Sequence, residues 1–95
     1  NIIFLELKRR GYEIYVGKYD DLEVDFIIKN NDGIKYIQVA LSVRDEKILD
    51  RELAPLYSIK DNYPKYLMTL DYDTVDYDGI RQISAIDFLL DKTDI

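Results

Sequence analysis

The chain of 95 residues contains no cysteine and no histidine. Disulfide bonds, thiolate zinc sites and nucleophilic dyads of the Ser-His or Cys-His type are therefore excluded within it, and any metal ion would have to be held by oxygen atoms. Long hydrophobic runs are also lacking, since stretches such as 2–5 and 26–28 are far too short to span a bilayer, and no segment resembles a signal peptide. These features predict a cytoplasmic protein without a membrane partner.

The composition predicts one folded domain. Apolar residues make up 47% of the chain and aromatic residues 13%, which is enough for a modest core. The net charge of −6 opposes nonspecific attraction to phosphate backbones. The first residue is Asn1 rather than methionine, and a helical pattern is already under way there, so we expect residues 1–95 to form a single domain that is a fragment of a longer chain.

Hydrophobic periodicity and turn residues predict the order of the elements. Helices are expected at 1–10, 44–60 and 85–92, and strands at 12–19, 22–29, 34–42, 63–71 and 80–84. Ser42 begins an S-x-x-D capping box for the second helix, and Pro55 predicts a kink or two abutting helices near 53–55. The order predicts an α/β fold with a mixed central sheet flanked by helices.

Each of the two strands of the predicted hairpin carries one polar residue in an otherwise apolar stretch, Asp25 and Gln38. Because side chains alternate along a strand, a turn at 31–32 places Asp25 opposite Gln38, and a turn at 32–33 places it opposite Ala40. Either turn brings the apolar residues of both strands to one shared face: Val24, Phe26, Ile28, Ile37, Val39 and Leu41. The polar face could simply be half exposed, and a solvent-facing Asp beside a Gln needs no function.

Several stretches together resemble a known family: FLELKRRGYEIYVGK, EVDFI, YIQVALS, RELAPL and IKDNYPKYLMTLDYD. A helix carrying a Glu, followed by a hairpin with V-D-F-I and Y-I-Q-V and by a second helix, is similar to the PD-(D/E)XK nuclease superfamily of restriction endonucleases and Holliday junction resolvases. The whole combination more closely resembles the C-terminal domain of unknown function that follows the P-loop module of certain bacterial and archaeal AAA+ type ATPases. The resemblance implies a restriction endonuclease-like αβββαβ core. It places ATP in an N-terminal module outside this chain, which has no glycine-rich phosphate loop.

In the nuclease pattern, acidic residues of the first helix and the hairpin hold Mg²⁺ or Mn²⁺, and a lysine stabilises charge on the phosphate. By this resemblance, Glu6, Asp25 and Gln38 occupy the catalytic and metal-binding positions, and Ala40 occupies the position of the lysine. Gln38 and Ala40 depart from the pattern, because the first is neutral and the second offers no polar group. A lysine of the second predicted helix could take over the missing role: the candidates are Lys47 and Lys60.

The resemblance therefore implies a nuclease-like domain without catalysis of its own, which serves recognition or regulation beside its own ATPase module. Two alternatives stay open. One is a Mg²⁺-dependent endonuclease acting on DNA, and the other is a protein-interaction or oligomerisation module that binds another protein or forms homo-oligomers. No cofactor is expected unless the degenerate site binds Mg²⁺ or Mn²⁺.

The acidic segment 71–79 and the tyrosines of the strands could each serve binding, but each also has a purely structural explanation. Residues 71–79 contain four aspartates, but their spacing does not fit an EF-hand, so we interpret this segment as a solvated acidic loop. Tyr15 and Tyr36 are expected on the polar side of their strands, where they could share a surface with Asp25 and Gln38. Such a surface could stack nucleic acid bases, although tyrosine is also common in strands and at protein interfaces.

Overall fold

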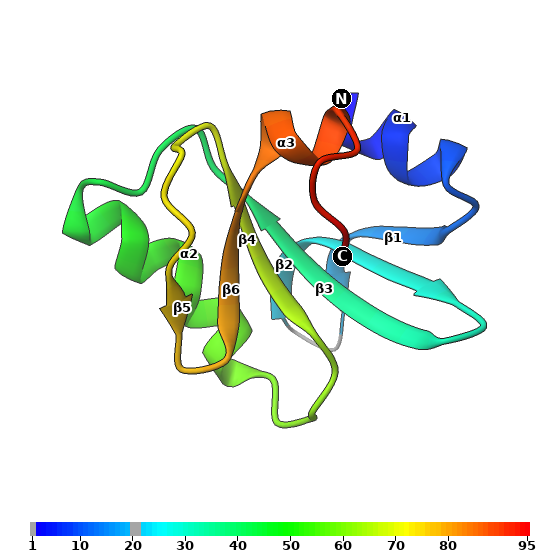
Figure 1. The fold of residues 1–95 in the computed structure, drawn as a ribbon. Coiled ribbons are helices and arrows are strands. Elements are labelled where there is room, and N and C mark those ends of the chain that lie inside the picture. The colour runs from blue at the N-terminus through cyan, green and yellow to red at the C-terminus, as the bar shows by residue number, and fades with distance from the viewer. Residues whose placement is uncertain (1, 20–21) are drawn as a thin grey trace.

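The computed structural model describes residues 2–19 and 22–95, which form a β-sheet with helices packed on both of its faces (Figure 1). The helices are α1 (Ile2–Arg9), α2 (Glu46–Ser58) and α3 (Ala85–Leu89). The strands are β1 (Glu13–Tyr19), β2 (Leu22–Asn30), β3 (Gly33–Val39), β4 (Lys65–Thr69), β5 (Asp76–Tyr77) and β6 (Ile80–Ser84).

The strands form one mixed sheet in the order β1-β2-β3-β4-β6-β5. The first three strands are antiparallel neighbours, β3, β4 and β6 run parallel to one another, and β5 returns antiparallel at the edge. Helix α2 connects the parallel strands β3 and β4, as a parallel pair requires. The predicted α/β fold with a mixed sheet flanked by helices is confirmed.

Two hydrophobic cores lie on opposite faces of the sheet. The first core is covered by α1 and α3, which contribute Ile3, Leu7 and Phe88. The second core is covered by α2, which contributes Leu53 and Leu56. Helices therefore cover both faces of the hairpin β2–β3 over much of its length, and the buried Gln38 must find its partners inside the protein, whereas Asp25 stays exposed.

The hairpin has the predicted two-residue turn at 31–32, because Asn30 pairs with Gly33 and the ladder continues to Phe26 opposite Ile37. Gly33 has a φ of 123°, a conformation that side chains rarely adopt. Of the two registers that the sequence leaves open, the structure selects the one that brings Asp25 and Gln38 together.

A β-bulge at Asp25 changes which residues share a face. Val16 of β1 pairs with Phe26, but the next residue, Gly17, pairs with Val24, so Asp25 has no partner in β1. The extra residue reverses the alternation, and Val24 enters the second core while Phe26 enters the first. The prediction that Val24 and Phe26 share one face is therefore wrong.

Helix α2 differs from the prediction at its start and near its end. Its N-cap is Asp45, whose side chain accepts hydrogen bonds from the backbone N–H groups of Lys47 and Ile48, so the predicted capping box beginning at Ser42 is wrong. Pro55 lies inside one continuous helix rather than between two abutting helices. Within the described residues, no helix is long and apolar enough to cross a membrane.

Candidate functional site

Asp25 and Gln38 hold β2 and β3 together where their backbone ladder stops. The ladder ends at Phe26 and Ile37. Beyond it, the backbone N–H of Asp25 donates to Gln38 Oε1 at 2.7 Å, and the N–H of Val39 donates to Asp25 Oδ2 at 2.9 Å. Each side chain thus replaces a backbone acceptor of the opposite strand, which satisfies two N–H groups that the bulge would otherwise leave unpaired.

The amide of Gln38 is directed toward α2. The side chain is only 5% exposed, and its Nε2 donates to the backbone carbonyl and to the carboxylate of Glu52, both at 3.4 Å. Glu52 is a site residue that we did not predict. The signal was present, because Glu52 falls on the same helical stripe as Leu49, Leu53 and Leu56, where a charged residue is unusual.

Asp25 and Glu52 line the same hollow of about 380 Å³ between α2 and the hairpin. Burial, and next the negative charge of Asp25, raise the pKa of Glu52, while the guanidinium of Arg51 opposes this shift. Arg51 is the cationic residue that lines the hollow, and neither Lys47 nor Lys60 contributes to its lining. The hollow is therefore lined by the carboxylate of Asp25 from β2 and by the carboxylate of Glu52 and the guanidinium of Arg51, both from α2.

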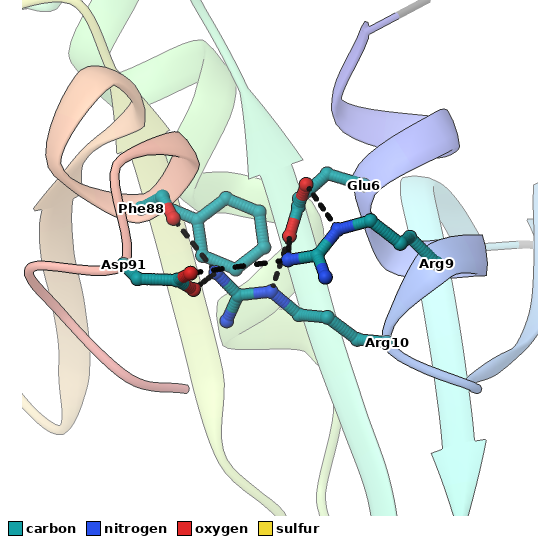
Figure 2. A network of polar contacts seen from close by, with 5 residues as sticks. All are labelled: Glu6, Arg9, Arg10, Phe88 and Asp91. Carbon is teal, nitrogen blue, oxygen red and sulfur yellow. Dashed lines mark hydrogen bonds and ion pairs between the residues drawn. The ribbon is translucent and has the colours of Figure 1, made fainter.

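Glu6 belongs to a different network, which joins α1 to α3 (Figure 2). Its carboxylate accepts hydrogen bonds from Arg9 Nη2 at 2.6 Å and from Arg10 Nε at 2.8 Å. Arg10 also donates to the carbonyl of Phe88 at 2.7 Å and to Asp91 at 2.8 Å, and its guanidinium lies 4.0 Å from the Phe88 ring centroid. Hydrogen bonds from Arg9 and Arg10 lower the pKa of Glu6 to about 2.

The predicted metal ligands do not fit a divalent cation. Such an ion needs several oxygen ligands, but the amide oxygen of Gln38 and one oxygen of Asp25 accept from backbone N–H groups, and Glu6 is paired with two arginines. Across residues 2–19 and 22–95, no group of three or more carboxylate side chains is arranged to hold a metal ion. Ala40, which the resemblance places at the lysine position, is half-buried against the second core and provides no charge.

Tyr15 and Tyr36 line one hollow together, but Asp25 and Gln38 line a different one, so the predicted surface shared by all four residues is not formed. Tyr36 is buried under α2, and its hydroxyl donates to Asp61. Tyr15 is half exposed, and its hydroxyl donates to Glu13. The prediction placed Tyr36 on an accessible polar side of β3, but α2 covers that side.

The segment 71–79 is only partly a solvated loop. Asp71 is buried, and its carboxylate accepts from the N–H of Val43 at 3.0 Å and from Ser42 Oγ at 3.1 Å. These two hydrogen bonds lower the pKa of Asp71, and the bond from the Val43 N–H has the larger effect. The segment also contains β5. The prediction of a purely solvated acidic loop is therefore wrong at Asp71 and at β5.

Comparisons with known proteins give one informative relative. The chain is 45% identical over 91 residues to an uncharacterized protein of Haemophilus influenzae. The match covers 95% of this chain but 22% of the relative, so the chain spans about a fifth of the relative's length. No protein-family model and no solved structure matches the chain.

Proposed function

We propose that this chain is a nuclease-like accessory domain of a longer AAA+ type ATPase, which serves recognition or regulation and has no catalysis of its own. The sequence motifs and the αβββαβ order support the resemblance on which the proposal rests. The observation that carries the loss of catalysis is the mutual bonding of Asp25 and Gln38 across the hairpin.

Catalysis by a PD-(D/E)XK site needs free anionic oxygens for the metal and a cation beside the phosphate. In this chain the second hairpin position is the neutral Gln38, and its oxygen is occupied by a backbone N–H. The lysine position is Ala40. The polar pair therefore fixes the shape of the hairpin, and it provides the single carboxylate of Asp25 and no cation.

A cleavage assay tests this proposal. The domain is incubated with single-stranded, double-stranded and branched DNA in the presence of Mg²⁺ or Mn²⁺, beside the Asp25→Asn variant. We expect no cleavage above the buffer control for either protein. Cleavage by the wild type that is lost in Asp25→Asn would contradict the proposal.

A Mg²⁺-dependent endonuclease is the second candidate, and one observation favours it. Asp25 and Glu52 share a hollow with Arg51, so α2 supplies a carboxylate and a cation that the hairpin lacks. If this candidate is correct, cleavage in the same assay is lost in Glu52→Gln as well as in Asp25→Asn. Equal activity of wild type and Glu52→Gln would exclude it.

The regulatory role is tested in the longer polypeptide. Deletion of this domain is expected to change the rate of ATP hydrolysis or its response to a partner, because the domain is proposed to dock beside its own ATPase module. The alternative of an oligomerisation module predicts that the isolated domain forms a concentration-dependent dimer in light scattering. An unchanged ATPase rate together with such a dimer would favour that alternative.

A further inference from the structure

A second hollow, of about 340 Å³, lies between the carboxyl end of α2 and the amino ends of β4 and β6. We name it the α2-end hollow, and it shares no lining residue with the hollow of Asp25 and Glu52. Figure 1 shows the end of α2, the start of β4 and the turn between β5 and β6 near the lower edge of the molecule. Two tyrosines that are each 45% exposed line the hollow beside three buried aliphatic residues: Tyr57, Tyr63, Leu56, Ile59 and Ile80.

The two tyrosine side chains are held in place by the surrounding protein. The N–H of Tyr63 donates to Asp61 Oδ1 at 3.0 Å, and its carbonyl accepts from Lys65 Nζ at 2.9 Å. Its ring lies against Gly33 of the hairpin turn, where an added Cβ would approach Tyr63 Cε1 to 3.3 Å. Tyr57 donates its hydroxyl to a backbone carbonyl of β5 at 3.4 Å. Such preorganisation lowers the entropy cost of binding a ligand.

The charged groups that line the α2-end hollow leave one carboxylate unpaired. Lys65 is the only cation in its lining within residues 2–19 and 22–95. The ammonium group of Lys65 is already bound by Asp61 Oδ1 at 3.1 Å and by two backbone carbonyls at 2.9 Å. Asp78, in the turn between β5 and β6, has no hydrogen bond or ion pair to any residue that the structure describes. The lining therefore has a net negative charge that is located at Asp78.

Two further sources make the same region more negative. The carboxyl end of α2 carries partial negative charge, and its last turn contains no basic residue. Lys60 follows the helix but does not line the hollow. The pKa of the Tyr57 hydroxyl is raised, first by burial and then by three negative charges: Asp78, Asp50 and Asp76. Aromatic walls in a negative field favour a cationic ligand.

We propose that the α2-end hollow binds the guanidinium group of an arginine side chain that a protein partner supplies. A guanidinium stacks on tyrosine rings, pairs with a carboxylate such as Asp78, and is attached to a methylene stem that packs on aliphatic residues. The lysine ammonium is compact and more strongly hydrated, so it matches the aromatic wall less well. Free arginine carries two additional charges that would be partly desolvated in the hollow. Binding here requires neither the ATPase module nor the residues of the degenerate nuclease site.

Amide NMR of the domain tests the proposal with a blocked tripeptide, acetyl-Gly-Arg-Gly-amide. We expect chemical-shift changes centred on Tyr57, Tyr63 and Gly79, with a Kd of about 1 mM for a single side chain. The ligand controls are the same tripeptide with neutral citrulline, the same tripeptide with lysine, and free arginine. Each control ligand is expected to bind at least about threefold more weakly.

Two substitutions separate the charge from the aromatic wall. Asp78→Asn removes the carboxylate and keeps a residue type that tolerates the φ of 51° at this position. Tyr57→Leu removes one aromatic face and keeps an apolar side chain. We expect each substitution to weaken binding of the arginine tripeptide by about three- to fivefold. Glu46→Gln, at the opposite end of α2, removes the same charge and should leave the affinity unchanged. Circular dichroism checks that the variants are folded.

Several results would overturn the proposal. The absence of localised shift changes at millimolar tripeptide would show that the hollow does not bind the side chain. Equal affinity for the citrulline or lysine tripeptide would show that the guanidinium is not recognised. Free arginine that binds as tightly as the tripeptide would indicate a site for a small molecule instead of a protein. Equal weakening by Asp78→Asn and Glu46→Gln would reduce the binding to general attraction toward an acidic protein.

Discussion

At the scale of single residues, the hydrogen bonds of Gln38 explain why this polar side chain lies in an otherwise apolar strand. Its oxygen accepts the N–H of Asp25, and its amide group contacts Glu52. A buried amide has a defined set of donors and acceptors, and removal of one partner leaves the others desolvated and unpaired. Gln38 is therefore a structural residue, and its replacement removes hydrogen bonds that connect β3 to both β2 and α2.

Substitution of Gln38 by leucine keeps the volume and removes the hydrogen bonds. We expect the free energy of unfolding to fall by about 1–3 kcal/mol, because the partly buried Asp25 N–H loses its acceptor. Urea unfolding followed by circular dichroism measures the change. Asn62→Ala, an exposed amide, is the control and is expected to change stability by less than about 0.5 kcal/mol. A Gln38→Leu variant as stable as wild type would contradict this role.

Glu52 is the second residue whose environment predicts a measurable effect. Burial and the nearby Asp25 raise its pKa, so the folded state binds the Glu52 proton more tightly than the unfolded chain does. Stability from this group is therefore lost as the pH rises from the ordinary Glu pKa through the raised value. Glu52→Gln should be more stable than wild type at pH 7, and the difference should vanish below pH of about 4. A constant difference across this pH range would contradict the assignment.

At the scale of elements, the network around Arg10 fixes α1 against α3. Helix α1 has only eight residues, and helices shorter than about 12 residues are marginal by themselves in water. Packing of Ile3 and Leu7 holds its inner face, while Arg10 links Glu6 to Phe88 across the two helices. The stability of α1 therefore depends on tertiary contacts at both positions.

Replacement of Glu6 by glutamine tests this link through its pH dependence. The pKa of Glu6 is lowered to about 2, so the stability that its charge contributes is present above the unfolded pKa of about 4.5 and is lost as the pH falls toward 2. Glu6→Gln should melt at a lower temperature than wild type at pH 7 and at the same temperature near pH 2. Glu46→Gln, an exposed carboxylate at the start of α2, is the matched control. If both variants show the same pH profile, the network does not stabilise α1.

Pro55 provides a test within α2. Proline inside a helix costs about 3 kcal/mol relative to alanine, and its effect on the unfolded chain offsets about 0.4–1 kcal/mol of that cost. Because α2 is continuous through Pro55, Pro55→Ala is expected to raise the free energy of unfolding by about 1 kcal/mol or more. Pro64→Ala lies outside any helix and should not stabilise the protein. Loss of stability in Pro55→Ala would show that packing of the proline ring outweighs the helical cost.

At the scale of the whole molecule, the α/β class with a mixed sheet follows from the sequence, whereas the choice between the two hairpin registers and the helical cover on both faces of the sheet do not. Alternation and the turn residues are local signals, and they predict that Asp25 shares a face with Gln38 and Ala40 but leave open which of the two it meets. The bulge at Asp25 depends on pairing with β1, a longer-range choice that alternation within β2 cannot reveal. The same holds for Glu52, which becomes a partner of Gln38 only once α2 packs on the sheet.

We infer that Asp25 and Gln38, which are joined to each other and to the backbone, do not form a metal site with Glu6. A Mn²⁺ titration of the domain followed by amide NMR tests it most directly, because a bound paramagnetic ion broadens nearby signals. We expect that the amides of Glu6, Asp25 and Gln38 are not broadened more than those near exposed carboxylates elsewhere in the domain. Selective broadening centred on these three residues at low Mn²⁺ concentration would contradict it.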